Sequence, residues 1–207
     1  MNVAVLVSGG GTNLQAILDQ IKDKRLCGVD IVKVISSNTN AYALERAKMV
    51  NIPTEVISRK KYESLDEYND AMLFSLQEAK TELVVTAGFL SLLGPKVLRF
   101  FENRVINIHP SLIPAFCGKG MYGIRPHEAA IEKGVKVSGA TVHFLNEKYD
   151  EGPILLQKAV EVFFEDTPEI LQQRIMKECE QELLPKAIFL IAQNKVRIEN
   201  GRVFIDF

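Results

Sequence analysis

Asn107 and His109 are the two residues of this sequence whose types and spacing best suit catalysis. They lie two positions apart in the apolar, β-branched segment 105–109, so on a strand both side chains share one face. Pro110 has no N–H to donate and is expected to end that strand. An amide and a titratable imidazole delivered together at a strand end can stabilise a carbonyl oxygen. From the residues alone, His109 is interpreted equally well as a site residue or as a core histidine.

A glycine-rich run, SGGGTN at residues 8–13, is the second candidate site. It lies between an apolar strand pattern and an amphipathic helix pattern, where backbone N–H groups and the positive helix start favour an anion. The spacing is neither G-x-G-x-x-G nor that of the P-loop, whose lysine it lacks. The run therefore indicates a phosphate monoester rather than a dinucleotide or a nucleoside triphosphate. The alternative is a tight strand-to-helix turn that binds nothing.

Asp150 is followed by Glu-Gly-Pro, a turn composition, and its default interpretation is a solvated turn carboxylate. A catalytic role requires this loop to fold back over the end of the His109 strand, where a carboxylate would favour the imidazolium and orient it. Cys117 follows His109 closely in sequence. Nothing in the sequence places its sulfur within reach of the imidazole, so a thiol nucleophile is not favoured.

The other two histidines are interpreted as structural or peripheral. His143 lies in the middle of a strand pattern and is expected to be a satisfied core residue, whereas His127, early in a short helix, is expected to be exposed or locally capped. No pair of histidines has the spacing of a zinc site, and the three cysteines are far apart without a CxxC pair. We therefore expect no metal, and three free thiols in a reducing cytoplasm.

Alternating strands and helices must position these residues. Ligands of parallel α/β sheets bind at the carboxyl ends of the strands, and the glycine-rich run, the loop after Ala87 and the Asn107/His109 pair all fall at such ends. The alternation predicts an α/β fold, a Rossmann-like, mostly parallel twisted sheet with helices on both faces. The patterns predict strands at 3–7, 31–35, 54–57, 83–87 and 105–109, and helices at 13–21, 41–50 and 65–78.

The C-terminal half is predicted to end in a helix and a hairpin. Pro185 lacks an N–H and should break or kink that helix. A hairpin is indicated by the Asn-Gly pair between two short apolar runs. The expected elements are a short helix at 126–132, strands at 137–145 and 154–162, a helix capped by Thr167 and running from Pro168 toward Leu184, a helical segment at 186–193 and the hairpin at 196–205.

Bulk composition bounds the class of protein. The chain has 207 residues, 47% of them hydrophobic and 25% charged, with a formal net charge of −1. This fits one soluble domain spanning 1–207 and provides no global attraction to nucleic acid or anionic membrane. The N-terminal apolar run is too short for a signal peptide, and no stretch is long enough for a transmembrane helix. We expect a cytoplasmic protein with neither nucleic-acid nor membrane partners.

Five runs, taken in order, resemble the glycinamide ribonucleotide formyltransferases, a folate-dependent family of purine synthesis. The resemblance implies that a formyl group passes from 10-formyltetrahydrofolate, a co-substrate, to the amine of glycinamide ribonucleotide through a tetrahedral intermediate, without a metal. It also implies that Asn107, His109 and Asp150 form a catalytic trio that stabilises or protonates the oxyanion. The runs lie at residues 8–14, 87–89, 107–114, 141–144 and 149–154.

The resemblance implies binding residues as well. In this interpretation the N-terminal half binds the phosphate substrate and the C-terminal half binds folate, in a monomer or homodimer. Ser91 and Leu65 stand where some family members carry arginines toward the folate's glutamate tail, so this tail should be held more weakly or by other residues. The implied contacts are Gly11, Thr12 and Asn13 with the phosphate, Glu180 with the ribonucleotide, and Leu90, Ser91, Leu92, Leu93 and Asn107 with the folate.

Three other functions stay open. Methionyl-tRNA formyltransferase shares the trio but needs an RNA-binding domain after this one, and formyltetrahydrofolate hydrolase needs a regulatory domain before it. A chain that begins at its first core strand and ends after its last hairpin is expected to have neither. A non-catalytic phosphometabolite-binding module would use only the glycine-rich run, and would leave the trio unexplained as a set.

Overall fold

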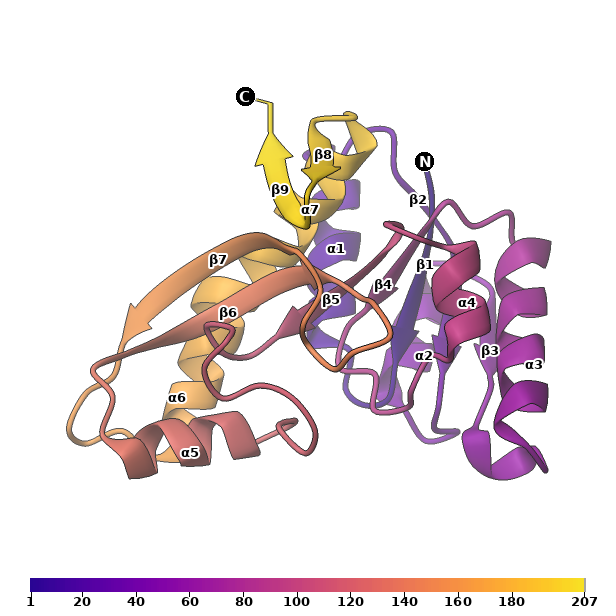
Figure 1. Ribbon diagram of the computed structural model, residues 1–207. Coiled ribbons are helices and arrows are strands. Elements are labelled where there is room, and N and C mark those ends of the chain that lie inside the picture. The colour runs from indigo at the N-terminus through magenta and orange to yellow at the C-terminus, as the bar shows by residue number, and fades with distance from the viewer. Residues whose placement is uncertain (207) are drawn as a thin grey trace. The chain divides into compact units, whose positions relative to one another are not determined.

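The computed structural model describes residues 1–206 and contains a seven-stranded sheet, covering helices and a separate two-stranded hairpin (Figure 1). The strands are β1 (Asn2–Val7), β2 (Asp30–Ser36), β3 (Thr54–Val56), β4 (Leu83–Thr86), β5 (Val105–His109), β6 (Val137–Phe144), β7 (Ile154–Glu161), β8 (Val196–Glu199) and β9 (Arg202–Ile205). The helical segments are α1 (Thr12–Lys22), α2 (Tyr42–Met49), η1 (Arg59–Lys61), α3 (Leu65–Glu78), α4 (Pro95–Phe100), α5 (Arg125–Lys133), α6 (Pro168–Ile175), η2 (Met176–Glu180) and α7 (Gln181–Ala192).

The strand order of the large sheet is β3-β2-β1-β4-β5-β6-β7. The β1–β2, β1–β4 and β2–β3 pairs are parallel, and β6–β7 is antiparallel. This arrangement confirms the predicted Rossmann-like, mostly parallel α/β fold. The sequence did not predict α4 or η1, because each has too few residues to show a helical period. Among the described residues, no helix is long and apolar enough to cross a membrane.

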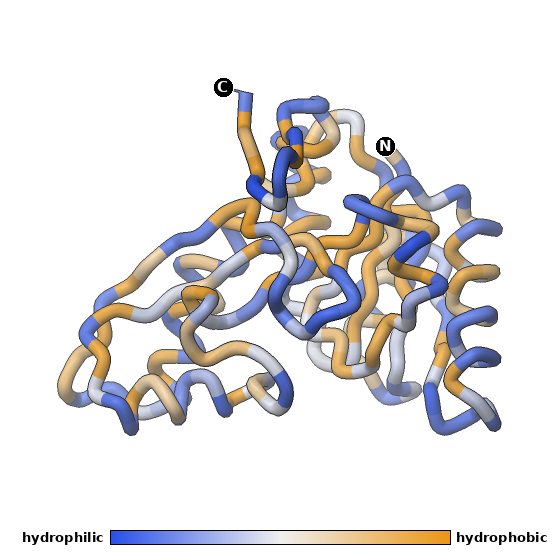
Figure 2. The backbone as a smooth tube through the Cα atoms, in the orientation of Figure 1, coloured by the Kyte–Doolittle hydropathy of each residue, from blue (hydrophilic) through white to orange (hydrophobic). Residues whose placement is uncertain are grey.

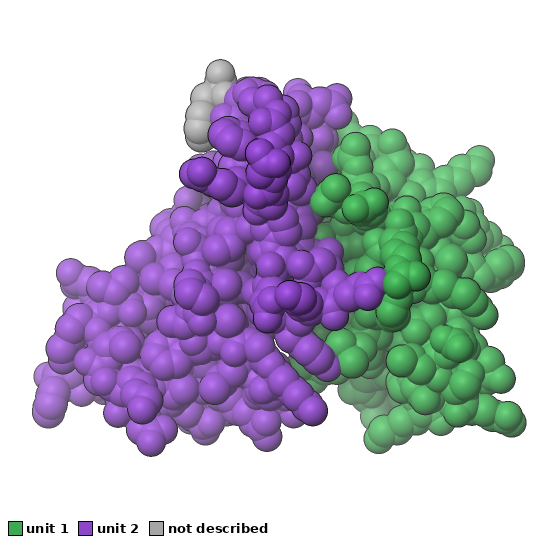
Figure 3. Space-filling view, in the orientation of Figure 1, with its two compact units in different colours: residues 1–106 green, residues 107–207 purple. Residues whose placement is uncertain are grey.

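Contacts divide the chain into two compact units, residues 1–106 and the residues from Asn107 onward (Figure 3). The first unit is built around β1, whose residues 3–7 are fully buried. Figure 2 shows β1 hydrophobic along its length, whereas α3 alternates hydrophobic and hydrophilic residues, as expected for a helix with one face on the core. Because the strand order reverses between β1 and β4, the loops that follow these strands flank a topological switch point, where such sheets bind ligands.

The second unit contains the C-terminal helices, and here the predicted break at Pro185 is not observed. Pro185 does not break the helix but lies inside α7. The irregularity is instead η2, a π-helical turn between α6 and α7. Pro185 cannot donate to the preceding turn, and the wider π turn directly before that turn changes the hydrogen-bond spacing from i+4 to i+5. The hairpin prediction is confirmed, with Asn200 and Gly201 at φ 51° and 73°, as a type I′ turn requires.

Candidate active site

His109 is the last residue of β5, and only 4% of its surface is exposed. Its Nε2 lies 3.0 Å from the carbonyl oxygen of Phe116. Because a carbonyl oxygen only accepts, Nε2 carries a hydrogen and donates it, so Nδ1 is the acceptor nitrogen of the neutral ring. Phe116 has a φ of 51°, a left-handed conformation that is costly for a bulky residue. The surrounding loop therefore maintains a strained residue that presents its carbonyl to His109.

Asp150 lies beside His109, which the sequence left undecided. Its Oδ2 is 3.8 Å from His109 Nδ1, and the carboxylate side chain is 14% exposed. The same oxygen accepts the backbone N–H of Gly118 at 2.8 Å. At 3.8 Å the contact with the imidazole is electrostatic rather than a hydrogen bond. It places negative charge next to the ring nitrogen that would carry the imidazolium proton, so the loop after β6 does fold back over the end of β5.

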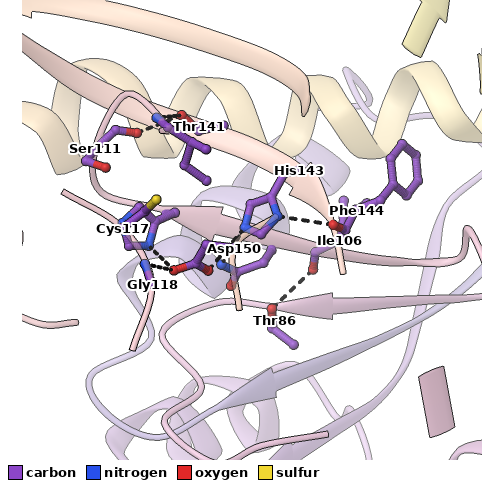
Figure 4. A network of polar contacts seen from close by, with 12 residues as sticks. Thr86, Ile106, Ser111, Cys117, Gly118, Thr141, His143, Phe144 and Asp150 are labelled. Atoms are coloured by element: carbon purple, nitrogen blue, oxygen red, sulfur yellow. Dashed lines mark hydrogen bonds and ion pairs between the residues drawn. The ribbon is translucent and has the colours of Figure 1, made fainter. Parts of the chain in front are cut away.

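His143 of β6 orients the amide of Asn107. Its Nδ1 donates to the carbonyl of Phe144 at 3.1 Å, which leaves Nε2 as the acceptor of the neutral ring. That nitrogen lies 3.1 Å from Asn107 Nδ2 and 3.6 Å from Asp150 Oδ1. Figure 4 shows the ring between Phe144 and Asp150. The prediction of a satisfied core histidine is confirmed, but the sequence missed that it lies between Asn107 and Asp150, because these residues lie 36 positions before it and seven after it.

A polar network holds the loop that follows β5 (Figure 4). Thr141 Oγ1 donates to the Ser111 carbonyl at 2.7 Å and accepts the Ile113 N–H at 3.1 Å. Gln157 of β7 donates to the Ile113 carbonyl and to Thr141 Oγ1, each at 3.0 Å. Ser111 Oγ closes the loop by donating to the Ala115 carbonyl at 2.6 Å. Sequence reasoning missed Thr141 and Gln157 as supporting residues, since no local signal distinguishes them from other strand residues.

The pKa values of His143 and of the Cys117 thiol shift in opposite directions. Burial lowers the pKa of His143 to about 4 against the opposing effect of the Asp150 carboxylate. The pKa of the Cys117 thiol is raised, first by burial and then by Asp150 and Glu151. Its Sγ donates to the Pro114 carbonyl at 3.3 Å. A thiol held in its protonated form is a poor nucleophile, in agreement with the interpretation of the sequence.

The expectation that His127 is exposed or locally capped is wrong. It is 1% exposed within α5, and neither ring nitrogen has a hydrogen-bond partner. Burial, and to a lesser extent the charge of His109, lowers its pKa to about 4. The sequence did not reveal this because its helix is short and gives no clear apolar stripe; in the structure α5 turns Pro126, His127 and Ala130 inward.

The glycine-rich loop leads directly into α1, so the predicted phosphate residues lie together at a helix start. Gly11 is the N-cap, in a left-handed conformation with φ 72° and ψ 35°. A side chain is excluded there, because a Cβ on Gly11 would lie 2.6 Å from the Ala43 Cβ. The first turn, which begins with Thr12 and Asn13, has no acidic residue, and Gly11 provides no side-chain cap. The positive end of α1 is therefore not neutralised from within the helix.

Ser8 links this loop to the loop that follows β4. The backbone N–H of Leu90 donates to Ser8 Oγ at 2.9 Å, and Ser8 Oγ lies 2.6 Å from Ser37 Oγ. In the predicted folate segment, Leu90 and Leu92 are 64% and 51% exposed, whereas Leu93 is buried. This segment thus presents apolar side chains and a half-buried Ser91. Sequence reasoning missed the bridging role of Ser8, whose partners lie far along the chain.

Glu180 is the last residue of the π turn and is 7% exposed. Only the family pattern singled it out in the sequence. The π turn independently indicates a functional site at Glu180, because such turns are frequent at functional sites. Among residues 1–206, no group of three or more His, Cys, Asp or Glu side chains is arranged to hold a metal ion.

A family model matches most of the chain. Residues 1–188 match the family model described as formyl transferase. The chain belongs to the formyl transferase family. The matched span includes every residue that the sequence predicted for the site, from Gly11 to Glu180.

Other formyl transferases resemble the chain over its whole length. Phosphoribosylglycinamide formyltransferase of Haemophilus influenzae is 38% identical over 204 residues, covering 99% of this chain and 93% of that protein. The crystal structure of glycinamide ribonucleotide transformylase 1 from Symbiobacterium toebii superposes with a TM-score of 0.93 at 42% identity, covering 99% of this chain and 93% of that one. The chain is 39% identical to trifunctional purine biosynthetic protein adenosine-3 of Gallus gallus over 98% of its own length, but spans only 20% of that relative.

The formyl transferase fold also occurs in a protein named for a different reaction. The structure of a formyltetrahydrofolate deformylase from Pseudomonas syringae pv. tomato superposes with a TM-score of 0.88 at 25% identity, covering all of this chain and 66% of that one. The fold alone therefore does not determine which reaction the site catalyses.

Proposed function

We propose that this formyl transferase moves the formyl group of 10-formyltetrahydrofolate to the amine of glycinamide ribonucleotide, producing formylglycinamide ribonucleotide and tetrahydrofolate for purine biosynthesis. The observation that carries the proposal is the cluster of Asn107, His109 and Asp150, with Asp150 Oδ2 3.8 Å from His109 Nδ1. Family membership and the full-length relatives named for this reaction support it.

The proposed chemistry is direct attack of the amine on the formyl carbon. A C–N bond forms, and the formyl oxygen becomes an oxyanion. Asn107 and His109 stabilise or protonate this oxygen, because both present polar atoms on the same face of β5. His109 acts through Nδ1, since Nε2 donates to Phe116. When the intermediate collapses, the bond to the folate nitrogen breaks, and that nitrogen receives a proton as the amine loses one.

Asp150 is proposed to hold the imidazolium and to help to move the proton. Its Oδ2 is fixed by the Gly118 N–H, so the carboxylate faces His109 Nδ1 without depending on the substrate. At 3.8 Å it provides charge stabilisation, and a water between the two groups could relay a proton. His143 is proposed as a positioning residue, because it fixes the direction of the Asn107 amide.

The substrate phosphate is proposed to bind at Gly11, Thr12 and Asn13. The left-handed Gly11 and the start of α1 direct backbone N–H groups outward, where a phosphate monoester is favoured. Glu180 is proposed to bind the ribonucleotide. In this proposal the glycine-rich run at residues 8–13 binds the substrate phosphate and is more than a tight strand-to-helix turn.

The folate is proposed to bind along Leu90, Ser91, Leu92 and Leu93, and at Asn107. The donor contains a flat ring system, and the exposed Leu90 and Leu92 side chains offer apolar surface for it. Because Ser91 and Leu65 provide no cation, we propose that the glutamate tail is held weakly or by other residues. Residues 1–207 would act as a single formyltransferase domain. The proposed phosphate residues lie in its N-terminal half, and so do four of the five proposed folate residues, Leu90–Leu93.

His109→Ala tests this function. We expect turnover to fall by roughly two to four orders of magnitude, because general acid catalysis and oxyanion stabilisation are lost together. Substrate binding should largely survive. Absorbance follows the loss of 10-formyltetrahydrofolate in the presence of glycinamide ribonucleotide. Cys117→Ser is the matched control, since it lies in the same loop and has no proposed role. Near-normal turnover of His109→Ala would rule out the mechanism.

Hydrolysis of the formyl donor is the second candidate, favoured by the structural match to a deformylase. The same absorbance assay separates the two reactions. A transferase consumes the donor only when glycinamide ribonucleotide is present, whereas a hydrolase consumes it with water alone. Binding of phosphate without consumption of the donor would instead support a phosphometabolite-binding module.

The proposed partners are these two small molecules, with no nucleic acid and no membrane, in a cytoplasmic monomer or homodimer. The match to relatives of similar length supports small-molecule substrates. Sedimentation velocity of the purified chain decides between monomer and homodimer. A nucleic-acid gel shift tests the proposal that the chain does not bind nucleic acid.

A further inference from the structure

We propose that Arg46 is a positioning residue for the substrate phosphate, holding the glycine-rich loop so that its backbone N–H groups face the anion. Arg46 lies on α2, outside the predicted site residues and without a role in the chemistry. The inference rests on the proposed function, in which Gly11, Thr12 and Asn13 bind the phosphate. All residues that carry it belong to the unit formed by residues 1–106.

The Arg46 guanidinium joins the loop to the helix that follows it. Its Nε donates to the Gly10 carbonyl at 2.8 Å, and its Nη1 donates to Gln15 Oε1, also at 2.8 Å. Tyr42, one turn earlier on α2, places its ring 5.0 Å from the guanidinium carbon. A planar fork of donors suits this pair of contacts, whereas the single ammonium of a lysine cannot reproduce both with the same geometry.

These contacts determine where the loop's N–H groups point. The Ala43 N–H donates to the Gly9 carbonyl at 3.1 Å, and Arg46 occupies the next carbonyl, that of Gly10. In a trans peptide the C=O and the following N–H point in opposite directions. Since both carbonyls are directed to α2, the N–H groups of Gly10 and Gly11 are directed away from it. The loop thus turns donors, and not carbonyl oxygens, toward the side where an anion can lie.

Close packing makes this arrangement dependent on α2. A Cβ on Gly11 would lie 2.6 Å from Ala43 Cβ and 3.5 Å from Arg46 Cδ, so the loop runs directly against this helix. Arg46 is half-buried there. Its positive charge lies beside the positive end of α1, and both favour an anion over a neutral ligand. Loss of Arg46 would free the Gly10 carbonyl to turn toward the phosphate and repel it.

The test compares Arg46→Met, Arg46→Lys and Lys48→Met. Lys48 lies on the same helix, is exposed and forms an ion pair with Glu45, so its variant controls for the loss of one positive charge. Binding of inorganic phosphate is measured by calorimetry, and KM is measured for each substrate. We expect Arg46→Met to weaken phosphate binding about ten- to a hundredfold and to raise the KM for glycinamide ribonucleotide by the same factor. The KM for the folate and kcat should stay within about twofold.

Arg46→Lys should recover part of the phosphate affinity, and Lys48→Met should behave like the unaltered chain. Phosphate affinity of Arg46→Met within twofold of the unaltered chain overturns the inference, as does an unaltered chain that does not bind phosphate. An equal loss in the kinetics of both substrates also overturns it, because that pattern reports general damage. If Arg46→Met does not fold, Arg46→Lys decides by the same measurements. Loss of phosphate binding in a chain that transfers no formyl group would support Arg46 while refuting the proposed function.

Discussion

His127→Leu provides a test of the second unit's electrostatics. The imidazole is 1% exposed and has no hydrogen-bond partner, and burial lowers its pKa to about 4 from an ordinary 6.5. Above pH 6.5 it is neutral in the folded and unfolded chains alike. As the pH falls from 6.5 toward 4, the unfolded chain binds a proton that the folded chain excludes, so this residue progressively destabilises the fold.

The magnitude follows from the two pKa values. A pKa of about 4 in the folded chain against 6.5 in the unfolded chain corresponds to a loss of about 2 kcal/mol at pH 5 and about 3 kcal/mol at pH 4. His127→Leu removes this term and leaves His143 and all carboxylates in place. At pH 7 the variant should be at least as stable, because it replaces an unsatisfied polar ring with an apolar side chain of smaller volume.

Urea unfolding of both chains at pH 7, 6, 5 and 4.5 measures the difference in the free energy of unfolding. Contributions of the other titrating groups cancel in that difference, since both chains contain them. We expect the difference to grow in favour of His127→Leu as the pH falls. A constant difference from pH 7 to pH 4.5 would refute the argument that the buried imidazole resists protonation.

Two further substitutions test how the loops are held. Gly152→Ala should lower turnover at least tenfold while the far-UV circular dichroism stays unchanged. The added Cβ would lie 1.7 Å from the Phe144 carbonyl oxygen, so the loop that carries Asp150 must be displaced. Unchanged turnover would contradict this prediction. Ser8→Ala should destabilise the fold by about 1 kcal/mol in urea, since it removes the acceptor of the part-buried Leu90 N–H, and should raise the KM for the folate. Wild-type values for both would disprove the link between the loops.

Much of the fold could be predicted from the sequence because its signals are local. The apolar runs marked β1 and β5, and the helical period marked α3 with the bounds that the structure shows. The Asn200 and Gly201 turn was predictable because few residues adopt positive φ at low cost. Weak or short periods, as in α4, were not visible. A break at Pro185 was expected from its missing N–H alone, whereas α7 continues through it to Ala192.

The shared face of Asn107 and His109 at a strand end follows from the sequence, since side-chain alternation is a property of any strand. The position of Asp150 3.8 Å from His109 Nδ1, and the contact by which His143 orients Asn107, depend on the tertiary structure. The tertiary structure also determines that His127 is buried without a partner. These outcomes depend on where loops return after long stretches of chain, and such contacts are selected by packing and hydrogen bonding across elements rather than by any local preference.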